Sequence, residues 1–455
     1  MNLSNNRLCG VWDERGTQKG NYDAEGITAI ADALRVNSGL TSIDLSRNQL
    51  GDEGWGAIFA AICGNKDSKI MSMDASSEDI GPAGVKLIAE ALRTSVTGAL
   101  TVTNLLGNKL DAESAKMLAE VAKQKGISLC GIQRDQTTAD FSRISLSFIC
   151  CNLTTADFRS RQGLNPPDAI LLASDLSQAG VTGVLRSLNL SSNNFCSVNE
   201  RGYMEVSDVQ GKGGSVAYAF RQQGTYTAEF ITAIADALRV HGGLTSVNLS
   251  NNNLGEEGTK AICEALEQNK TLKELNLSGS DNNGRAAGAK HVAKMLGVNV
   301  GLTSLSLAKN ELDDDGAEAI SIGLKENKSL TNLDLSGKGY GDGLIGPRGA
   351  AALASAIAVN GAWTFVELRG NKLGDEGWGA MFAAICGNKD SKIMSMDASS
   401  ENIGHAGVKL IAEALRTSVA GALTKCDLRC NNMGGKGEAS IRNALQGRAG
   451  FELHL

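Results

Sequence analysis

The sequence predicts an α/β solenoid, in which an inner parallel β-sheet is covered by an outer row of α-helices. A strand-like motif, LxxLxLxxN, recurs about every thirty residues, and in most copies a glycine follows its first position by fourteen residues. Composition agrees, because 54 glycines and 4 prolines among 455 residues, with 42% apolar and 21% charged residues, are typical of neither collagen nor disorder. We therefore expect one elongated domain over residues 1–455, built from about thirteen units.

The motif itself is predicted to be a short β-strand followed by a turn. Its fourth and sixth positions are apolar and alternate with mostly polar residues, which is the pattern of a half-buried strand. Successive first positions lie 27 to 33 residues apart, except for two steps of 58 and 59 residues that contain insertions. In order, the first positions are Leu40, Ile70, Leu100, Ile127, Leu185, Leu244, Leu272, Leu302, Leu330, Trp363, Ile393, Leu423 and Phe451.

A helix is predicted after each turn. Apolar residues stand at offsets 18 and 22 from the first position, as in Ile58 and Ile62, and this four-residue spacing puts them on one helical face. A single unit cannot bury both of its apolar faces, so stacked units are expected to share one continuous core. The glycine at offset fourteen marks a place where the backbone turns or approaches a neighbour closely. These glycines are Gly54, Gly84, Gly258, Gly316, Gly377, Gly407 and Gly437.

These repeats resemble leucine-rich repeats of the ribonuclease-inhibitor subtype, the long class that also occurs in the sensor part of NOD-like receptors and in Ran GTPase-activating proteins. The resemblance covers nearly the whole chain and implies a horseshoe-shaped solenoid. Proteins of this family share a shape and bind unrelated partners. The resemblance therefore implies a non-catalytic scaffold that binds a protein on its concave sheet. The alternatives are a Ran-type GTPase-activating protein and the sensor part of a NOD-like receptor.

Two segments, 133–170 and 194–226, interrupt the period between a strand and its helix, and we expect them to be insertions. In the first segment, Ile144, Leu146 and Phe148 alternate with serines, which predicts an added strand. Insertions in repeat proteins collect on the loops of one face. The first segment is therefore either a binding protrusion or a tolerated surface loop.

Two stretches of the chain, 48–101 and 371–424, are near copies that agree at 49 of 54 positions. Recent duplication is the simplest cause, so identity between the copies does not by itself indicate function. His405, for example, stands where the other copy has Pro82. The chain begins in mid-repeat and stops one strand into a further unit, so we expect either a longer polypeptide or caps formed by flanking segments.

No catalytic constellation, metal site or cofactor is predicted. The sequence GDGLIG at 341–346 has the glycine spacing of a dinucleotide fingerprint, but the repeat register explains it as an expanded turn. Acid clusters such as Asp52 and Glu53 are interpreted as charges that offset a helix macrodipole, since they lack the spacing of a calcium loop. Trp55 and Trp378 are expected to pack between neighbouring helices rather than to form a docking anchor. The cysteines are expected to be buried structural thiols.

Composition also limits the partners. A net charge of only −6 indicates no general affinity for nucleic acid or an anionic membrane. No run of about 18 apolar residues could span a bilayer, and the start of the chain lacks the layout of a secretory signal. We expect a cytoplasmic location with reduced thiols, and a protein partner rather than nucleic acid or membrane.

The candidate site is the exposed face of the sheet. The fifth motif position points away from the core, and it is acidic in the four consecutive units that start at 330, 363, 393 and 423. Strands about 4.8 Å apart would bring these like charges together at a cost in free energy. Either Arg369, Lys425 and Arg429 at neighbouring positions offset them, or the row is a docking stripe for a basic partner surface, with Phe365 as an apolar anchor. The predicted contact residues are Asp44, Asp74, Asp334, Glu367, Asp397, Asp427, Phe365, Arg369 and Arg429.

Overall fold

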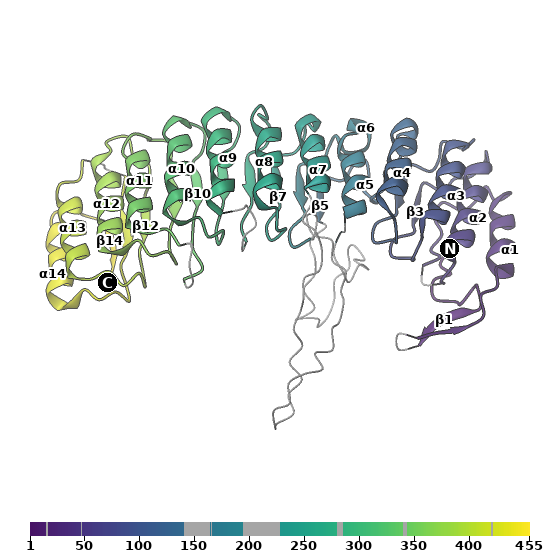
Figure 1. Ribbon diagram of the computed structural model, residues 1–455, viewed down its shortest axis with the longest axis horizontal. Coiled ribbons are helices and arrows are strands. Elements are labelled where there is room, and N and C mark those ends of the chain that lie inside the picture. The colour runs from purple at the N-terminus through teal and green to yellow at the C-terminus, as the bar shows by residue number, and fades with distance from the viewer. Residues whose placement is uncertain are drawn as a thin grey trace, which may run out of the picture.

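The structure is a computed structural model that describes residues 1–14, 17–46, 48–140, 164, 166–193, 228–279, 285–339, 344–419 and 422–455. In these residues, strand–helix units stack side by side into an open arch (Figure 1). The helices form one row along the arch, and the short strands lie in a second row beside it. This arrangement confirms the predicted α/β solenoid with a parallel sheet and outer helices.

The strands of the array are three residues long and run parallel to one another. Their register aligns equivalent motif positions, so that Asp334 lies opposite Glu367 and Asp397 lies opposite Asp427. The fourth motif position is the buried centre of most strands, as predicted. The described strands of the repeat array pair in three groups: β3 Ser72–Asp74 with β4 Val102–Asn104; β5 Thr138–Asp140, β6 Ser187–Asn189, β7 Ser246–Asn248, β8 Glu274–Asn276, β9 Ser304–Ser306, β10 Asn332–Asp334 and β11 Phe365–Glu367; and β12 Ser395–Asp397, β13 Lys425–Asp427 and β14 Glu452–His454.

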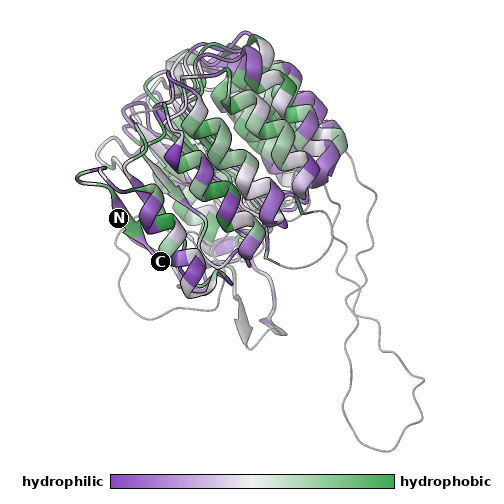
Figure 2. Cartoon of the chain, turned by 90° about the vertical axis from the view of Figure 1, so that its left-hand side faces the viewer, coloured by the Kyte–Doolittle hydropathy of each residue, from purple (hydrophilic) through white to green (hydrophobic). Residues whose placement is uncertain are grey.

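The helices are amphipathic and turn their apolar face toward the strands. Ile58 and Ile62, at the predicted offsets, are both buried, and green and purple residues alternate along the helices in Figure 2. Among the described residues, no helix combines the length and the apolar character needed to cross a bilayer. The helices are α1 Glu25–Leu34, α2 Gly51–Gly64, α3 Pro82–Arg93, α4 Ala112–Lys125, α5 Pro166–Leu176, α6 Ala179–Thr182, α7 Glu229–Val240, α8 Gly255–Leu266, α9 Arg285–Val298, α10 Asp313–Glu326, α11 Pro347–Ile357, α12 Gly374–Gly387, α13 His405–Arg416 and α14 Gly434–Ala444.

The glycine column marks close approaches between neighbouring units. A Cβ atom added to Gly377 would lie 2.9 Å from the Cβ of Ala350, on the preceding helix. A Cβ atom at Gly84 or Gly407 would lie 2.5 or 2.6 Å from a carboxylate oxygen of the preceding unit. At these three positions a side chain would not fit unless the neighbouring unit shifted, so the close-approach interpretation is confirmed there.

Two columns of mostly asparagine residues tie many of the units to the one before. In the predicted turn column, the Nδ2 of Asn252 donates to the carbonyls of Leu190 and Leu249, each at 2.8 Å, and its Oδ1 accepts from the backbone N–H of Asn193. A second column, which the motif does not reveal, lies in the turn from helix to strand. There the Nδ2 of Asn327 donates to carbonyls of the preceding unit, and its Oδ1 accepts from backbone N–H groups of its own turn. Both columns satisfy buried backbone groups that would otherwise be unpaired.

His241 takes the place of asparagine in the second column. Its Nδ1 accepts from the N–H groups of Gly243 and Leu244 at 3.1 and 3.2 Å, which places the ring proton on Nε2. The Nε2 lies 3.0 Å from the carbonyl oxygen of Thr182 in the preceding unit and donates to it. Burial lowers the pKa of His241, because the imidazolium form would be charged and would have no acceptor at Nδ1.

The acid clusters at the helix starts do more than offset a macrodipole. Asp52 lies in the first turn of α2, as predicted, and its Oδ1 accepts from the N–H of Gly81, the residue that precedes α3, at 2.7 Å. In the second near copy, the Oδ1 of Asp375 accepts from Gly404 at the same distance. Glycine offers no side chain to cap its helix, so the preceding unit provides the cap.

The structure corrects the register of the last unit. Glu452 pairs with Lys425 and His454 with Asp427, so Gly450 holds the first motif position and the prediction of Phe451 is wrong. A shorter step between units, 27 residues instead of 28, is the reason. An antiparallel hairpin, β1 Val11–Glu14 with β2 Thr17–Gly20, precedes α1 and has no counterpart in the motif.

Most of the two predicted insertions lies outside the described residues. This includes Ile144, Leu146 and Phe148, the added strand predicted from alternation, and the whole of 194–226. A strand does occur slightly earlier, because β5 lies at Thr138–Asp140 and pairs with β6. The first insertion therefore contributes one strand to the sheet.

We predict that His241 makes the solenoid sensitive to acid. The unfolded chain takes up a proton at this residue near the ordinary pKa of 6.5, whereas the folded chain resists protonation. The free energy of unfolding should therefore fall as the pH drops below about 6.5, by at most about 1.4 kcal/mol per pH unit. Urea denaturation at a series of pH values should show a shallower fall for His241→Asn than for the wild-type chain. The exposed His405, changed to Asn, serves as the control, and equal slopes for both variants would contradict the prediction.

We also predict that the aspartate caps stabilise the stacking of units. Asp52→Ala and Asp375→Ala should each lower the free energy of unfolding by about 1 kcal/mol, because each leaves the N–H of a glycine without its partner. The adjacent exposed acids, changed in Glu53→Ala and Glu376→Ala, should alter it by less than about 0.5 kcal/mol. Urea denaturation measures both pairs, and a loss of equal size at the two positions would rule out a capping role.

Candidate functional site

The fifth motif position serves the turn that follows each strand. In nearly every described unit, the side chain at this position accepts a hydrogen bond from the backbone N–H two residues later, at 2.9–3.3 Å. Aspartate and asparagine are the residues best suited to this local bond. The residue type is therefore explained without any ligand. The residues are Asp44, Asp74, Asn104, Asn189, Asn248, Asn276, Asp334, Glu367, Asp397 and Asp427.

The row of four acids is brought together, and arginines of the same chain contact it. Arg369 bridges two of these acids, with its Nε 3.0 Å from Glu367 Oε1 and its Nη1 3.0 Å from Asp397 Oδ2. These contacts raise the pKa of Arg369, chiefly through its hydrogen bond to Glu367. Arg369 therefore links β11 to β12, two strands that share no ladder in the described chain.

Asp427 has a cation of its own. Its Oδ2 lies 2.6 Å from Nη2 of Arg429, and its Oδ1 lies 3.0 Å from Nε, so the pair is bidentate. The hydrogen bonds from Arg429 lower the pKa of Asp427, which is itself buried. Lys425 does not join this row, because its Nζ lies 2.7 Å from Glu452 on β14.

The side chains of the remaining predicted acids accept hydrogen bonds from neutral groups. Asp334 accepts from the hydroxyls of Ser306 and Ser336 at 3.0 and 2.8 Å. Asp74 accepts from the hydroxyl of Ser76 at 2.7 Å, and Asp44 accepts from the backbone N–H of Ser46 at 3.0 Å. The first two lie on β10 and β3, in different parts of the array, so the nine predicted residues do not form one cluster.

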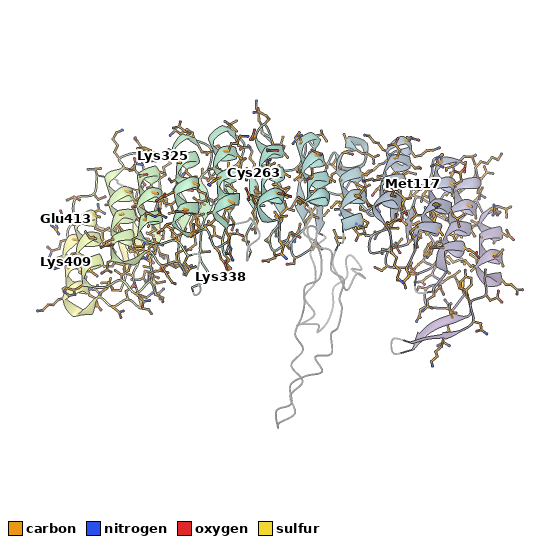
Figure 3. All side chains as sticks on the ribbon, viewed as in Figure 1. Met117, Cys263, Lys325, Lys338, Lys409 and Glu413 are labelled. Atoms are coloured by element: carbon orange, nitrogen blue, oxygen red, sulfur yellow. The ribbon has the colours of Figure 1, made fainter. Side chains whose placement is uncertain are left out.

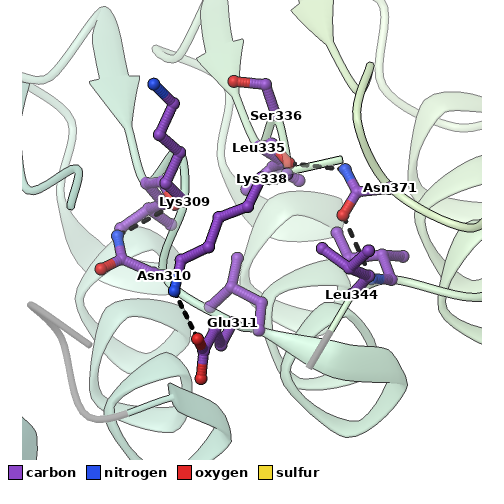
Figure 4. A pocket seen from close by; sticks show the side chains of 12 residues that line it. Lys309, Asn310, Glu311, Leu335, Ser336, Lys338, Leu344 and Asn371 are labelled. Atoms are coloured by element: carbon purple, nitrogen blue, oxygen red, sulfur yellow. Dashed lines mark hydrogen bonds and ion pairs between the residues drawn. The ribbon is translucent and has the colours of Figure 1, made fainter. Parts of the chain in front are cut away.

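Phe365, the predicted apolar anchor, is 46% exposed at the start of β11. Close to it in sequence, Glu367, Arg369 and Gly370 line an open hollow of about 280 Å³ together with residues 336–339. Lys338, at the lower edge of the array in Figure 3, forms an ion pair with Glu311, which Figure 4 shows from close by. The enclosed space beside this ion pair is only about 10 Å³, room for at most one water molecule and far too small for a cofactor.

The glycine-rich sequence at 341–346 falls only partly within the described residues. The two glycines at 341 and 343 lie outside them, but the N–H of Gly346 donates to Oδ1 of Asp314 at 2.7 Å. The N–H of Gly349, one turn further on, donates to the same oxygen at 2.7 Å. A carboxylate of the preceding unit thus holds the amides that a phosphate would need.

The tryptophans and most cysteines are buried where the sequence predicts. Trp55 and Trp378 are fully buried within α2 and α12, which confirms packing rather than docking. Burial raises the pKa of the Cys63 thiol to about 11, so it is not a reactive thiolate at neutral pH. Cys430 is exposed, and the prediction of a buried thiol is wrong for it. Among the described residues, no group of His, Cys, Asp and Glu is arranged to hold a metal ion.

Asp175 on α5 is a buried carboxylate that sequence reasoning missed. Its oxygens accept from the N–H groups of Leu129 and Cys130 at 2.8 and 3.0 Å, and from the hydroxyl of Ser128 at 2.7 Å. Burial raises its pKa to about 6, although the same hydrogen bonds work in the opposite direction. It anchors the segment that leads into the first insertion. The only sequence signal is an acid within an otherwise apolar helical stretch.

Comparison with known proteins identifies related repeats. A family profile described as "Leucine Rich repeat" matches residues 36–59, 244–263 and 299–321. The chain is 24% identical over 423 residues to "Ribonuclease inhibitor" of Mus musculus, covering 92% of this chain and 82% of that one. It is 26% identical over 352 residues to "Protein CARMIL" of Dictyostelium discoideum, covering 74% and 32%. It is 27% identical over 212 residues to "NACHT, LRR and PYD domains-containing protein 14" of Mus musculus, covering 40% and 21%.

The extent of these matches differs. The aligned region spans 82% of the ribonuclease inhibitor. It spans 32% of CARMIL and 21% of the NACHT-containing protein, so most of those two chains has no counterpart here.

We predict that the fifth position tolerates asparagine but not alanine. Asp334→Ala should lower the free energy of unfolding by about 1 kcal/mol, because the N–H of Ser336 loses its acceptor. Asp334→Asn keeps an acceptor oxygen and should change the stability by less than about 0.5 kcal/mol. Urea denaturation of the two variants measures the difference. Equal losses would show that the charge, and not the acceptor, stabilises this turn.

Proposed function

Because the chain belongs to the leucine-rich repeat family, in its ribonuclease-inhibitor-like subtype, we propose that it is a non-catalytic scaffold that binds a folded protein on the exposed face of its sheet. The observation that carries this proposal is the continuity of that face. From β5 to β11, seven strands pair in register, and the residues that flank the buried centre of each strand are polar, except for Phe365. The similar ribonuclease inhibitor is named for an enzyme that it inhibits.

The end of the array from β10 to β14 best fits a basic partner. At the third, fifth and seventh positions of these five strands stand five carboxylates and three cations, a net charge of −2. The ion pairs of Arg369 and Arg429 reduce the acidity of the row but leave this excess. The exposed ring of Phe365 provides an apolar contact beside it, of the kind that contributes strongly to binding energy when buried by a partner.

We propose the cytoplasm as the location of this scaffold. Six described cysteines are buried as free thiols, which supports a reducing compartment. No observation in the described part of the chain favours a Ran-type GTPase-activating protein or a receptor sensor over the scaffold, and both alternatives stay predictions.

Affinity capture from the native source, with cross-linking to map the contact face, would identify the partner. The variant Asp334→Asn/Glu367→Gln/Asp397→Asn/Asp427→Asn then tests the acidic row, because it removes four charges while keeping the acceptor of each turn. We expect it to bind the partner at least about tenfold more weakly, with a smaller dependence on salt.

A control variant changes four exposed helix carboxylates to glutamine: Glu53, Glu90, Glu376 and Glu413. It alters the net charge equally and should bind like the wild-type chain. If both variants bound the partner with unchanged affinity, the acidic row would not be the docking surface. If the cross-links fell only on the helices, the concave-face scaffold itself would be wrong.

A further inference from the structure

Two turns of the array are longer than their equivalents, and they are the same turn in the two near copies. In six other units, the residue of the second asparagine column, which lies in the turn from helix to strand, stands three residues before the first motif position. Asn65 and Asn388 stand five residues before Ile70 and Ile393. Each long turn, residues 65–69 and 388–392, reads Asn-Lys-Asp-Ser-Lys.

The long turns are held by their own hydrogen bonds. In the first copy, Asn65 Oδ1 accepts from Asp67 N at 3.0 Å, Asn65 O accepts from Ser68 N at 3.1 Å, and Ser68 Oγ accepts from Ile70 N at 3.4 Å. The same three bonds recur in the second copy at 3.0, 3.0 and 3.4 Å. A turn held in this way loses little conformational freedom when a ligand binds it.

The strand after each long turn presents an exposed methionine. The second motif position is Met71 or Met394, and these are 59% and 61% exposed. In the other units this position is polar, except in the last one, where it is Phe451. Val96 and Val419 are each 63% exposed, and their N–H groups donate to the carbonyls of Cys63 and Cys386, just before the long turns. In the described chain, β3 and β12 pair only with the strand that follows each of them.

Two lysines precede each of these methionines in the sequence. Lys66 and Lys69 in the first turn, and Lys389 and Lys392 in the second, are all exposed. Lys389 pairs with its neighbour Asp390 at 3.1 Å, whereas the other three lysines form no ion pair with any residue that the structure describes. Each copy thus combines two exposed apolar side chains with lysines that can pair with the carboxylates of a ligand.

We propose that these twin rim patches, Lys66, Lys69, Met71 and Val96 in one copy and Lys389, Lys392, Met394 and Val419 in the other, are two copies of one docking site. Each binds a protein segment in which an apolar side chain is flanked by carboxylates. The apolar side chain covers the methionine and the valine, and the carboxylates pair with the lysines. Charge complementarity selects an acidic segment, and the preformed turn fixes where it binds.

The positions of the patches make the chain bivalent. Helices α2 and α3 lie near one end of the arch and α12 and α13 near the other, so two ligand segments bind without touching (Figure 1). A partner that carries two such segments gains avidity from the fixed separation. This inference rests on the proposed scaffold function, but it uses a surface separate from the acidic row.

Selection of a phage-displayed library of random peptides, about 12 residues long, tests the proposal. The full chain is the target, and the variant Lys69→Glu/Met71→Ser/Lys392→Glu/Met394→Ser removes peptides that bind elsewhere. We expect the selected peptides to share an apolar residue flanked by Asp or Glu. Titration of the consensus peptide into the wild-type chain should give a stoichiometry of two by calorimetry.

Single variants assign the two sites. Met71→Ser and Met394→Ser should each weaken one site at least about tenfold, and the double variant should weaken both. Val240→Ser, at an exposed valine that precedes a short turn, is the matched control, and this variant should bind the peptide normally at both sites. Thermal melts confirm that the variants fold.

Any of three results would overturn the proposal of twin patches. The first is no enrichment of peptides on the wild-type chain over the counter-selecting variant, and the second is a stoichiometry of one in the wild-type chain. The third is a loss of peptide affinity in Val240→Ser equal to that in the methionine variants. The scaffold proposal would survive any of them if the captured partner still depended on the acidic row. If the captured partner were insensitive to both sets of variants, the acidic row and the twin patches would both be wrong.

Discussion

Each unit of this solenoid depends on its neighbours to satisfy its buried polar groups. The two asparagine columns concentrate that dependence, because one amide side chain closes its own turn and also binds carbonyls of the preceding unit. An unsatisfied buried group costs about 1–3 kcal/mol, so the loss of one ladder residue destabilises two units together. The apolar core tolerates many aliphatic substitutions. The asparagine columns, by contrast, accept only a side chain that can both donate and accept hydrogen bonds. His241 meets that requirement in its neutral form, and this is why a titratable group can stand in the ladder.

The need to satisfy backbone N–H groups also explains the acidic face of the sheet. A residue at the fifth position closes the turn after its strand, and aspartate and asparagine do so equally well. A row of acids therefore arises wherever the turn is closed by aspartate in consecutive units. Arg369 and Arg429 then offset the like charge within the chain. What distinguishes the β10 to β14 end is thus its excess of carboxylates and the exposed ring of Phe365, and not the presence of acids as such.

Departures from the repeat are more informative about surfaces than the repeat itself. Met71 and Met394 occupy a motif position that is also exposed in several other units but is polar there, while the apolar core beneath them stays buried. The first insertion contributes β5 to the sheet, and Asp175 holds the chain segment that precedes it. In both places the core continues unchanged while the surface acquires side chains that no neighbouring unit presents.

The sequence by itself determined the solenoid, the alternation of strand and helix, the close-approach glycines and the burial of Trp55 and Trp378. These features follow from periodicity within one unit, which is local and repeated many times. The tertiary structure alone decided the partners of the polar side chains: the acceptor role of the fifth position, the capping of α3 by Asp52, the second asparagine column and the buried Asp175. Each of these involves a hydrogen bond whose geometry or partner the motif does not encode, and several cross to a unit about thirty residues away. A pattern of apolar spacing carries no information about which donor meets which acceptor across that distance, and only the stacking of the units brings them together.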